Sequence, residues 1–166
     1  HNAELGDQGV ERYWGERWVP EARAGGVDVQ VLPVYIAPEV AEASLRSTLL
    51  QLEALEGEAA RTPEVAICRT GAEIDAALTE GKIALLLALE GTQGIGADVE
   101  LFSVMHRLGV RLVSFTHWSR ALLAEGSADE ETATPLPASG VRAVAELERL
   151  GILLDVSHLA SASVDH

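Results

Sequence analysis

The sequence contains little cysteine and no long apolar segment. Cys68 is the single cysteine among 166 residues, which excludes an intrachain disulfide framework. A lone thiol fits a reducing compartment, so we predict a cytoplasmic location. No apolar run approaches the roughly 18 residues that a transmembrane helix needs, and no signal peptide is recognisable. We therefore expect neither a disulfide-stabilised secreted domain nor a transmembrane segment.

Basic residues are also scarce. The chain has 12 Lys and Arg against 26 Asp and Glu, which gives a formal net charge of −14 at pH 7. Nucleic-acid binding requires a basic face that neutralises phosphates, so this balance argues against a nucleic-acid partner. The apolar fraction of 48% and the charged fraction of 23% are ordinary for a globular domain with a buried core.

The sequence does contain an alternation of apolar strands and helices. The predicted strands are 29–36, 82–91, 110–117 and 152–158, and the predicted helices are 39–61, 70–81, 98–108 and 139–150. Strands that are apolar throughout are typical of a parallel sheet that is covered on both faces. The tripeptide RLG precedes the last two strands, which indicates an internal repeat of helix, glycine and strand. These patterns predict an α/β fold.

Local signals refine the helices and loops. Thr70 and Glu73 form a capping box at the start of the helix 70–81, and the polar residues 119–139 predict a long loop. Stripes of large apolar residues predict the buried faces of the first and last helices. These stripes are Val40, Leu45, Leu49, Leu52 and Leu55 in one helix, and Val141, Val144, Leu147 and Leu150 in the other.

Two α/β architectures fit this order of elements. A doubly wound sheet needs phosphate-binding glycines after its first strand, but the candidate "GTQGIG" at 91–96 has the wrong spacing for the dinucleotide motif. In a βα-barrel, every strand carries its C-terminal residue to one shared mouth. The barrel explains why polar, metal-binding residue types follow several of the apolar strands, so we favour it.

Three such residues follow predicted strands. Glu90, His117 and His158 end the strands 82–91, 110–117 and 152–158, and His1 stands beside Asn2 at the start of the chain. A single histidine at a strand end is more often a hydrogen-bonded structural residue than a ligand. Glu90 is harder to explain in this way, because a buried carboxylate costs several kcal/mol unless it is paired or metal-bound. Together these residues predict a metal site at the barrel mouth.

The chain resembles the zinc dipeptidases of the membrane (renal) dipeptidase family. Five segments carry the resemblance and occur in the family's order: "HN" at the start, "AGGVDVQVLPVYI" (24–36), "GKIALLLALEG" (81–91), "LGVRLVSFTHWS" (108–119) and "ELERLGILLDVSHLA" (146–160). The resemblance implies a (β/α)8 TIM-type barrel of the metal-dependent hydrolase kind. Residues 1–166 would form the N-terminal half of that barrel, as a single partial domain.

The resemblance also implies a reaction and roles for individual residues. The family hydrolyses the peptide bond of dipeptides through a metal-activated hydroxide held by two zinc ions. By resemblance, His1 is a ligand of the first zinc, Glu90 bridges both zincs, and His158 is a ligand of the second. His117 contacts the substrate near its scissile carbonyl and stabilises the oxyanion. A dipeptide is the implied substrate, and the resemblance allows a homodimer.

One departure from the family pattern keeps other functions open. The family has an aspartate ligand two residues after its first histidine, where this sequence has Ala3. A methyl group does not bind zinc, which motivates a catalytically inactive barrel that acts as a binding or scaffold protein. Another metal-dependent amidohydrolase of barrel type, acting on a lactone or an acylated amino acid, is a further alternative.

Overall fold

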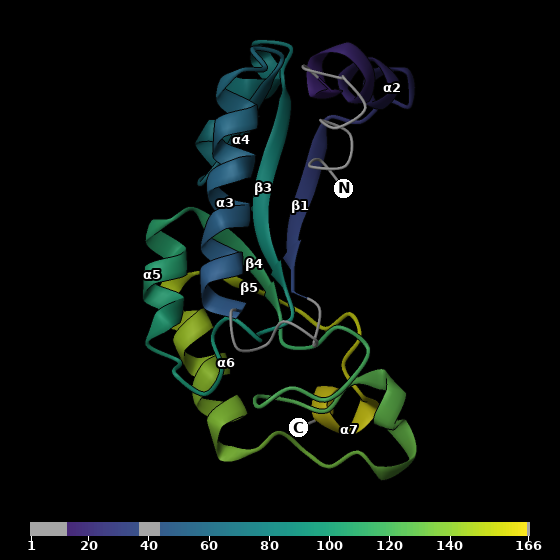
Figure 1. Ribbon diagram of the computed structural model, residues 1–166, viewed down its shortest axis with the longest axis vertical. Coiled ribbons are helices and arrows are strands. Elements are labelled where there is room, and N and C mark those ends of the chain that lie inside the picture. The colour runs from purple at the N-terminus through teal and green to yellow at the C-terminus, as the bar shows by residue number, and fades with distance from the viewer. Residues whose placement is uncertain (1–12, 37–43, 166) are drawn as a thin grey trace. The chain divides into compact units, whose positions relative to one another are not determined.

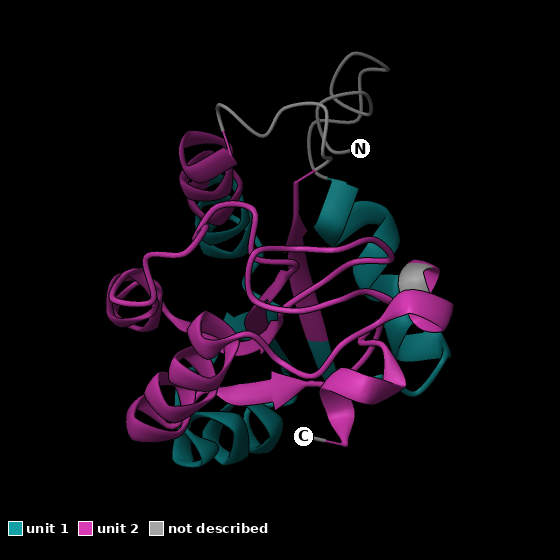
Figure 2. Ribbon diagram, turned by 90° about the horizontal axis from the view of Figure 1, so that it is seen from below, with its two compact units in different colours: residues 1–30, 54–85 teal, residues 31–53, 86–166 magenta. Residues whose placement is uncertain are grey.

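The computed structural model describes residues 13–36 and 44–165. The chain forms two compact units, one from residues 1–30 and 54–85 and the other from residues 31–53 and 86–166 (Figure 2). The predicted ligand His1, and Ala3 beside it, lie outside the described residues. Among the described residues, no helix has the length and apolar character needed to cross a membrane. The cytoplasmic location stays a prediction.

The described strands form one sheet. They are β1 (Val29–Tyr35), β2 (Val65–Ile67), β3 (Ile83–Glu90), β4 (Val110–Ser114) and β5 (Leu153–Asp155) (Figure 1). The order is β1-β3-β4-β5, and β2 pairs with the beginning of β3. The pairings of β2 with β3, β3 with β4, and β4 with β5 are all parallel. The parallel α/β prediction is confirmed.

The first unit contains the beginning of β3 with β2 and short helices. A π-helical turn, η1 (Trp14–Trp18), runs into α2 (Val19–Ala24), and α4 (Gly71–Thr79) follows β2. The predicted cap is confirmed, since the Glu73 amide donates to Thr70 Oγ1 at 3.2 Å, but the Glu73 carboxylate accepts from the amide of Arg69, one residue before the cap. Both bonds satisfy amides near the start of a helix, which would otherwise lack partners.

The second unit contains the end of β3, with β4 and β5. Its helices are α5 (Leu101–Arg107), α6 (Ala138–Leu150) and α7 (Ser161–Val164), and α3 (Ser44–Ala60) begins in it. The core of this unit is formed by fully buried side chains from β3, β4, α5 and α6, including Leu87, Val113, Phe102, Met105 and Leu147. Burial of each large apolar side chain stabilises the fold by about 1.5–3 kcal/mol.

Glycines end the helices that lead into the later strands. Gly81, Gly109 and Gly151 have φ values of 70°, 98° and 69° and stand directly before the segments that contain β3, β4 and β5. Left-handed backbone is easily adopted only by glycine, and it reverses the chain at the end of a helix. The helix-glycine-strand repeat predicted from the sequence is therefore present in the structure.

The predicted helix faces are wrong in part. The buried residues of α3 are Ser44, Thr48 and Leu52, and those of α6 are Gly140, Ala143 and Leu147. Leu52 and Leu147 belong to the predicted stripes, but Leu45, Leu49 and Val141 are exposed. Small residues allow close backbone approach: a Cβ at Gly140 would lie 2.2 Å from the Leu123 carbonyl oxygen. Contacts of this kind give no apolar stripe in a sequence.

Other element boundaries also differ from the prediction. The sequence pattern does not predict the short strand β2, and the predicted loop 119–139 contains a 3-10 helix, Ser127–Thr132. The last two strands are shorter than predicted and stop before their histidines. β4 ends at Ser114 and β5 at Asp155, so His117 and His158 lie in the connections that follow. The predicted helix start at 39–43 lies outside the described residues.

We predict that Phe102→Ala lowers the free energy of unfolding by about 3–5 kcal/mol, because it leaves a cavity in the core beneath α5. Phe102 is fully buried, whereas Leu108 at the end of the same helix is 39% exposed. Leu108→Ala is therefore the matched control and should cost about 1 kcal/mol or less. Urea unfolding followed by circular dichroism measures both. Equal losses in the two variants would contradict the assigned core.

Candidate metal centre

Glu90 is the last residue of β3, the longest of the described strands. Ala88 and Leu89 before it are buried, while the Glu90 side chain is 31% exposed. Pairing with Ser114 of β4 holds the Glu90 backbone in register. The strand therefore carries a carboxylate from an apolar interior to the edge of the sheet, where ionised groups are tolerated.

His117 and His158 occupy equivalent places after neighbouring strands. Each lies three residues beyond the end of its strand, which is Ser114 for β4 and Asp155 for β5. Because β4 and β5 are parallel and paired at Ser114 and Asp155, both histidines emerge at the same edge of the sheet as Glu90. The prediction that the strands bring these side chains together is confirmed by their positions.

The backbone turns sharply at both histidines. Trp118, directly after His117, has φ 65°, and the Ser119 amide donates to the His117 carbonyl at 2.8 Å. A hydrogen bond from residue i+2 to residue i with a positive φ between them defines a strained γ-turn. His158 itself has φ 66°. Strained backbone of this kind concentrates at functional sites, where the surrounding structure holds it in place.

Hydrogen bonds offset the strain at His158. Its carbonyl accepts from the Ser127 amide at 2.9 Å and from Thr116 Oγ1 at 3.0 Å. Left-handed backbone costs about 1–2 kcal/mol for a residue other than glycine, and each hydrogen bond contributes about 1 kcal/mol. The two bonds are thus comparable in size to the strain, so they can hold the His158 backbone in this conformation.

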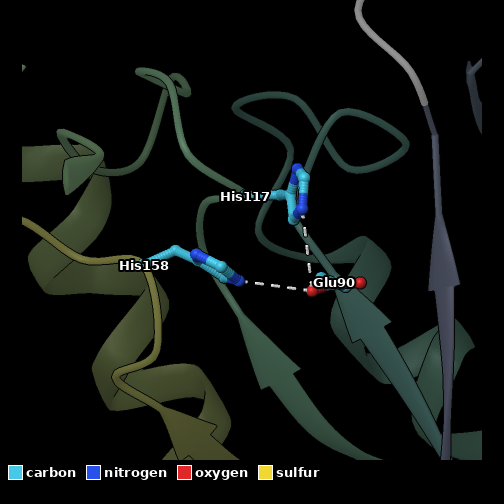
Figure 3. A group of neighbouring side chains, drawn as sticks. All are labelled: Glu90, His117 and His158. Atoms are coloured by element: carbon cyan, nitrogen blue, oxygen red, sulfur yellow. Dashed lines mark ion pairs between the residues drawn. The ribbon is translucent and has the colours of Figure 1, made fainter. Parts of the chain in front are cut away.

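The three side chains point toward one another (Figure 3). Glu90 Oε1 lies 3.4 Å from His158 Nε2 and 4.0 Å from His117 Nε2. The two imidazole rings make an edge contact, with centroids 4.8 Å apart and planes at 63°. One candidate ligand atom from each residue lies within 4.8 Å of the others. Each side chain is about one-third exposed, so the cluster is accessible to solvent.

This donor set suits a zinc ion. Carboxylate oxygen and neutral imidazole nitrogen are common zinc ligands, and both bind at about 2.0–2.2 Å. Two ligands at tetrahedral angles on one ion are then roughly 3.4 Å apart. The separation of 3.4 Å between Glu90 Oε1 and His158 Nε2 matches this value, whereas the 4.0 Å separation to His117 Nε2 is wider. Glu90 and His158 therefore fit a shared ion better than Glu90 and His117 do.

Tyr35 is a further residue of the site, one that the sequence analysis misses. It is the last residue of β1, and its ring packs on that of His117 with centroids 4.3 Å apart and planes at 57°. The Tyr35 carbonyl accepts from Gln51 Nε2 at 3.0 Å, which connects the end of β1 to α3. Its position at a strand end is the available signal, the same one that identifies Glu90.

An ion pair with a buried carboxylate lies in the loop after His117. Arg120 Nε donates to the two carboxylate oxygens of Glu125 at 2.9 and 2.8 Å, and Arg120 Nη2 also donates to Glu125 Oε1. The Glu125 side chain is only 9% exposed, and the hydrogen bonds from Arg120 hold its pKa below the ordinary value. The sequence shows only a polar loop here, because neither residue lies in a helix or strand with a periodic pattern.

The glycine-rich segment 91–96 does not form a phosphate cradle. The amides of Gly91 and Thr92 donate to the carbonyls of Ser114 and Phe115, and those of Ile95 and Gly96 donate to the Thr92 carbonyl. An anion site in such a loop requires amides that point at the ligand. Because four of these amides bond within the protein, the dinucleotide interpretation of this segment is not supported.

Comparison with known proteins adds an independent line of evidence. A family model described as membrane dipeptidase (peptidase family M19) matches residues 12–166. Dipeptidase verJ of Clonostachys rogersoniana is 30% identical over 128 residues, covering 74% of this chain and 32% of that protein. Dipeptidase aclJ of Aspergillus oryzae is 27% identical over 164 residues, covering 92% of this chain and 39% of that protein. The chain thus spans less than half the length of these curated relatives.

Solved structures show the same relationship. The dipeptidase AC, a metallopeptidase of family M19, superposes with a TM-score of 0.80 at 26% identity, covering 89% of this chain and 48% of that one. A metallopeptidase from Rhodobacter sphaeroides, bound to a phosphinate mimic of the dipeptide L-Ala-D-Ala, has a TM-score of 0.74 at 23% identity, covering 89% of this chain and 51% of that one. The matched structures of family M19 are of the TIM-barrel type, so the predicted fold class is confirmed.

We predict that Glu125→Gln lowers the free energy of unfolding at pH 7 by about 1 kcal/mol, since Arg120 is 70% exposed and solvent screens the pair. The pKa of Glu125 is lowered from 4.5 in the fold, so the ionised carboxylate stabilises the protein above that pH. This contribution is lost as the pH falls through the folded pKa. The difference between wild type and variant should therefore vanish in acid.

Urea unfolding between neutral and acidic pH measures the effect of Glu125→Gln. The exposed Glu148 supplies the control variant, Glu148→Gln, which should follow the wild-type curve throughout. A constant difference between wild type and Glu125→Gln at every pH would show that ionisation of this carboxylate does not stabilise the loop.

Proposed function

The chain belongs to the membrane dipeptidase family (peptidase family M19), and from this membership and the metal cluster we propose a zinc-dependent dipeptidase function. The observation that carries the proposal is the convergence of Glu90, His117 and His158 at the ends of three parallel strands. The relatives named as dipeptidases support a dipeptide substrate. The chain spans only part of those relatives, so the activity is proposed for the protein that contains it.

In this proposal, the following residues would hold two zinc ions. Glu90 would bridge both ions with its two carboxylate oxygens, and His158 would bind one of them through Nε2, which lies 3.4 Å from Glu90 Oε1. His1 would bind the other ion, by resemblance to the family, and it lies outside the described residues. Two such ions would supply Lewis acidity, which polarises a peptide carbonyl and lowers the pKa of water, so that hydroxide is available as the nucleophile at neutral pH.

His117 would contact the substrate. Its Nε2 lies 4.0 Å from the Glu90 carboxylate, which is too far for a hydrogen bond between them. A substrate carbonyl bound beside Glu90 would be within reach of this nitrogen. An imidazole N–H at that place can donate to the carbonyl oxygen as negative charge develops on it. The Tyr35 ring packs on His117 and restricts its rotation, which keeps the donor oriented before substrate arrives.

Metal content separates this proposal from the scaffold alternative, and substrate turnover separates it from other metal-dependent amidohydrolases. A hydrolase of this family should bind zinc through Glu90 and His158, whereas an inactive scaffold barrel should bind none. Turnover of lactones or acylated amino acids without turnover of dipeptides would favour another amidohydrolase. Dimerisation stays a prediction.

We predict that Glu90→Gln lowers zinc occupancy and abolishes dipeptide hydrolysis while the protein stays folded. The amide has almost the same size as the carboxylate, but it has no negative charge and is a poor zinc ligand. Elemental analysis, a dipeptide hydrolysis assay and circular dichroism measure the three properties. Glu131, which is exposed, gives the control variant Glu131→Gln with wild-type zinc and rate. Normal turnover by Glu90→Gln would show that Glu90 does not bind a metal needed for hydrolysis.

We predict different outcomes for the two histidines. His158→Ala should lose zinc and activity together, because it removes a ligand. His117→Ala should retain zinc and lose rate by about 10²–10³-fold, the usual effect of removing one oxyanion donor. His106→Ala, in α5, is the control and should change neither property. Equal zinc loss in His117→Ala and His158→Ala would show that His117 is a ligand.

A further inference from the structure

Three hydroxyl side chains are buried where the strands of the metal cluster end. Thr92, Ser114 and Thr116 are 1%, 2% and 0% exposed, so none of them is hydrated from bulk water. A buried hydroxyl is costly unless its hydrogen-bonding capacity is used within the protein. The hydrogen bonds of these hydroxyls are therefore structural contacts at this edge of the sheet.

Ser114 joins the end of β3 to the segment before His117. Its Oγ accepts from the Gly91 amide at 3.3 Å and donates to the Thr116 carbonyl at 3.1 Å. Gly91 follows Glu90 directly, and the Thr116 carbonyl belongs to the peptide bond that leads into His117. Thr92 adds a second connection, since its Oγ1 donates to the Phe115 carbonyl at 2.9 Å.

Thr116 joins the segment before His117 to His158. Its Oγ1 donates to the His158 carbonyl at 3.0 Å, and Thr116 is the neighbour of His117 in the chain. The Ser114 and Thr116 side chains thus form a continuous set of hydrogen bonds from Gly91 through Thr116 to His158. Each bond ends on a member of the metal cluster or on its direct neighbour.

These bonds begin where the regular sheet stops. The last register pairs of β3 with β4 and of β4 with β5 are Glu90 with Ser114, and Ser114 with Asp155. Beyond those pairs, the amides of Gly91 and Thr92 still donate to the carbonyls of Ser114 and Phe115, while His117 and His158 lie further along, next to or in turns with positive φ. Here the Ser114 and Thr116 hydroxyls connect the segments through hydrogen bonds, which an apolar side chain of the same size could not form.

We propose that Ser114 and Thr116 are positioning residues that set the separation of Glu90, His117 and His158 for metal binding. They act through the backbone of the cluster and do not contact the metal. This inference rests on the proposed metal-dependent function, since it requires that Glu90 and His158 bind zinc. Partners of this kind hold ligand side chains in the geometry that the ion needs, so their loss weakens binding.

Thr116→Val tests the inference, because it keeps the shape of the side chain and removes the donor to His158. We expect the affinity for Zn²⁺, measured by competition with a chromophoric chelator, to fall about tenfold. The visible absorption bands of the Co²⁺-substituted protein should shift, since they report ligand geometry. Thr116→Ser retains the hydroxyl and should restore both properties to near their wild-type values.

Thr62→Val is the matched control. Thr62 is 2% exposed, and its hydroxyl donates to the Glu58 carbonyl at 3.0 Å, one helical turn away and without any bond to the cluster. Both valine variants should lower the melting temperature, but only Thr116→Val should weaken metal binding. Unchanged Zn²⁺ affinity and an unchanged Co²⁺ spectrum in Thr116→Val would overturn the inference.

Failure of this inference can be told apart from failure of the proposed function and from misfolding of the variant. If Thr116→Val does not fold, Ser114→Ala carries the same test, with the same expected loss of Zn²⁺ affinity. A wild-type protein that binds no Zn²⁺ would overturn the proposed function and this inference together. A wild-type protein that binds Zn²⁺ with the same affinity as Ser114→Ala and Thr116→Val would overturn only the positioning role.

Discussion

The parallel register of β3, β4 and β5 is the constraint on which the site depends. Parallel strands deliver their C-terminal ends to one edge, so Glu90, His117 and His158 meet although 68 positions separate the first from the last. Leu87 of β3 and Val113 of β4 are fully buried, so the strand pairing that positions the site also packs the core. The apolar core of this unit and the chemistry at its edge are therefore set by the same strand pairing.

Much of this arrangement can be predicted from the sequence. The apolar runs identify β3, β4 and β5, and a charged or metal-binding residue after each run identifies Glu90, His117 and His158. Each residue alone is a weak signal, but three such residues after three parallel strands are expected to meet at one edge of the sheet. The roles assigned to the three residues come from family resemblance and stay predictions.

The helix faces, the ion pair in the loop and the strained turns depend on contacts that leave no periodic pattern in the sequence. The buried faces of α3 and α6 use Ser44, Thr48, Gly140 and Ala143 beside Leu52 and Leu147, so counting large apolar residues places these faces only in part. The pairing of Arg120 with its carboxylate partner forms only when an irregular loop folds back on itself. Turns with positive φ at residues other than glycine are likewise set by tertiary hydrogen bonds, which a single sequence does not reveal.

The left-handed backbone at His158 limits which side chains can take over its place in the site. Asparagine, aspartate and histidine adopt this conformation more readily than other residues except glycine, while β-branched residues are strongly disfavoured. The polar residues that tolerate φ 66° here all have an oxygen or nitrogen atom that can bind a cation. Exchange of His158 for aspartate would thus alter the charge and metal preference of the centre without new backbone strain, a route by which one fold can acquire different metal chemistries.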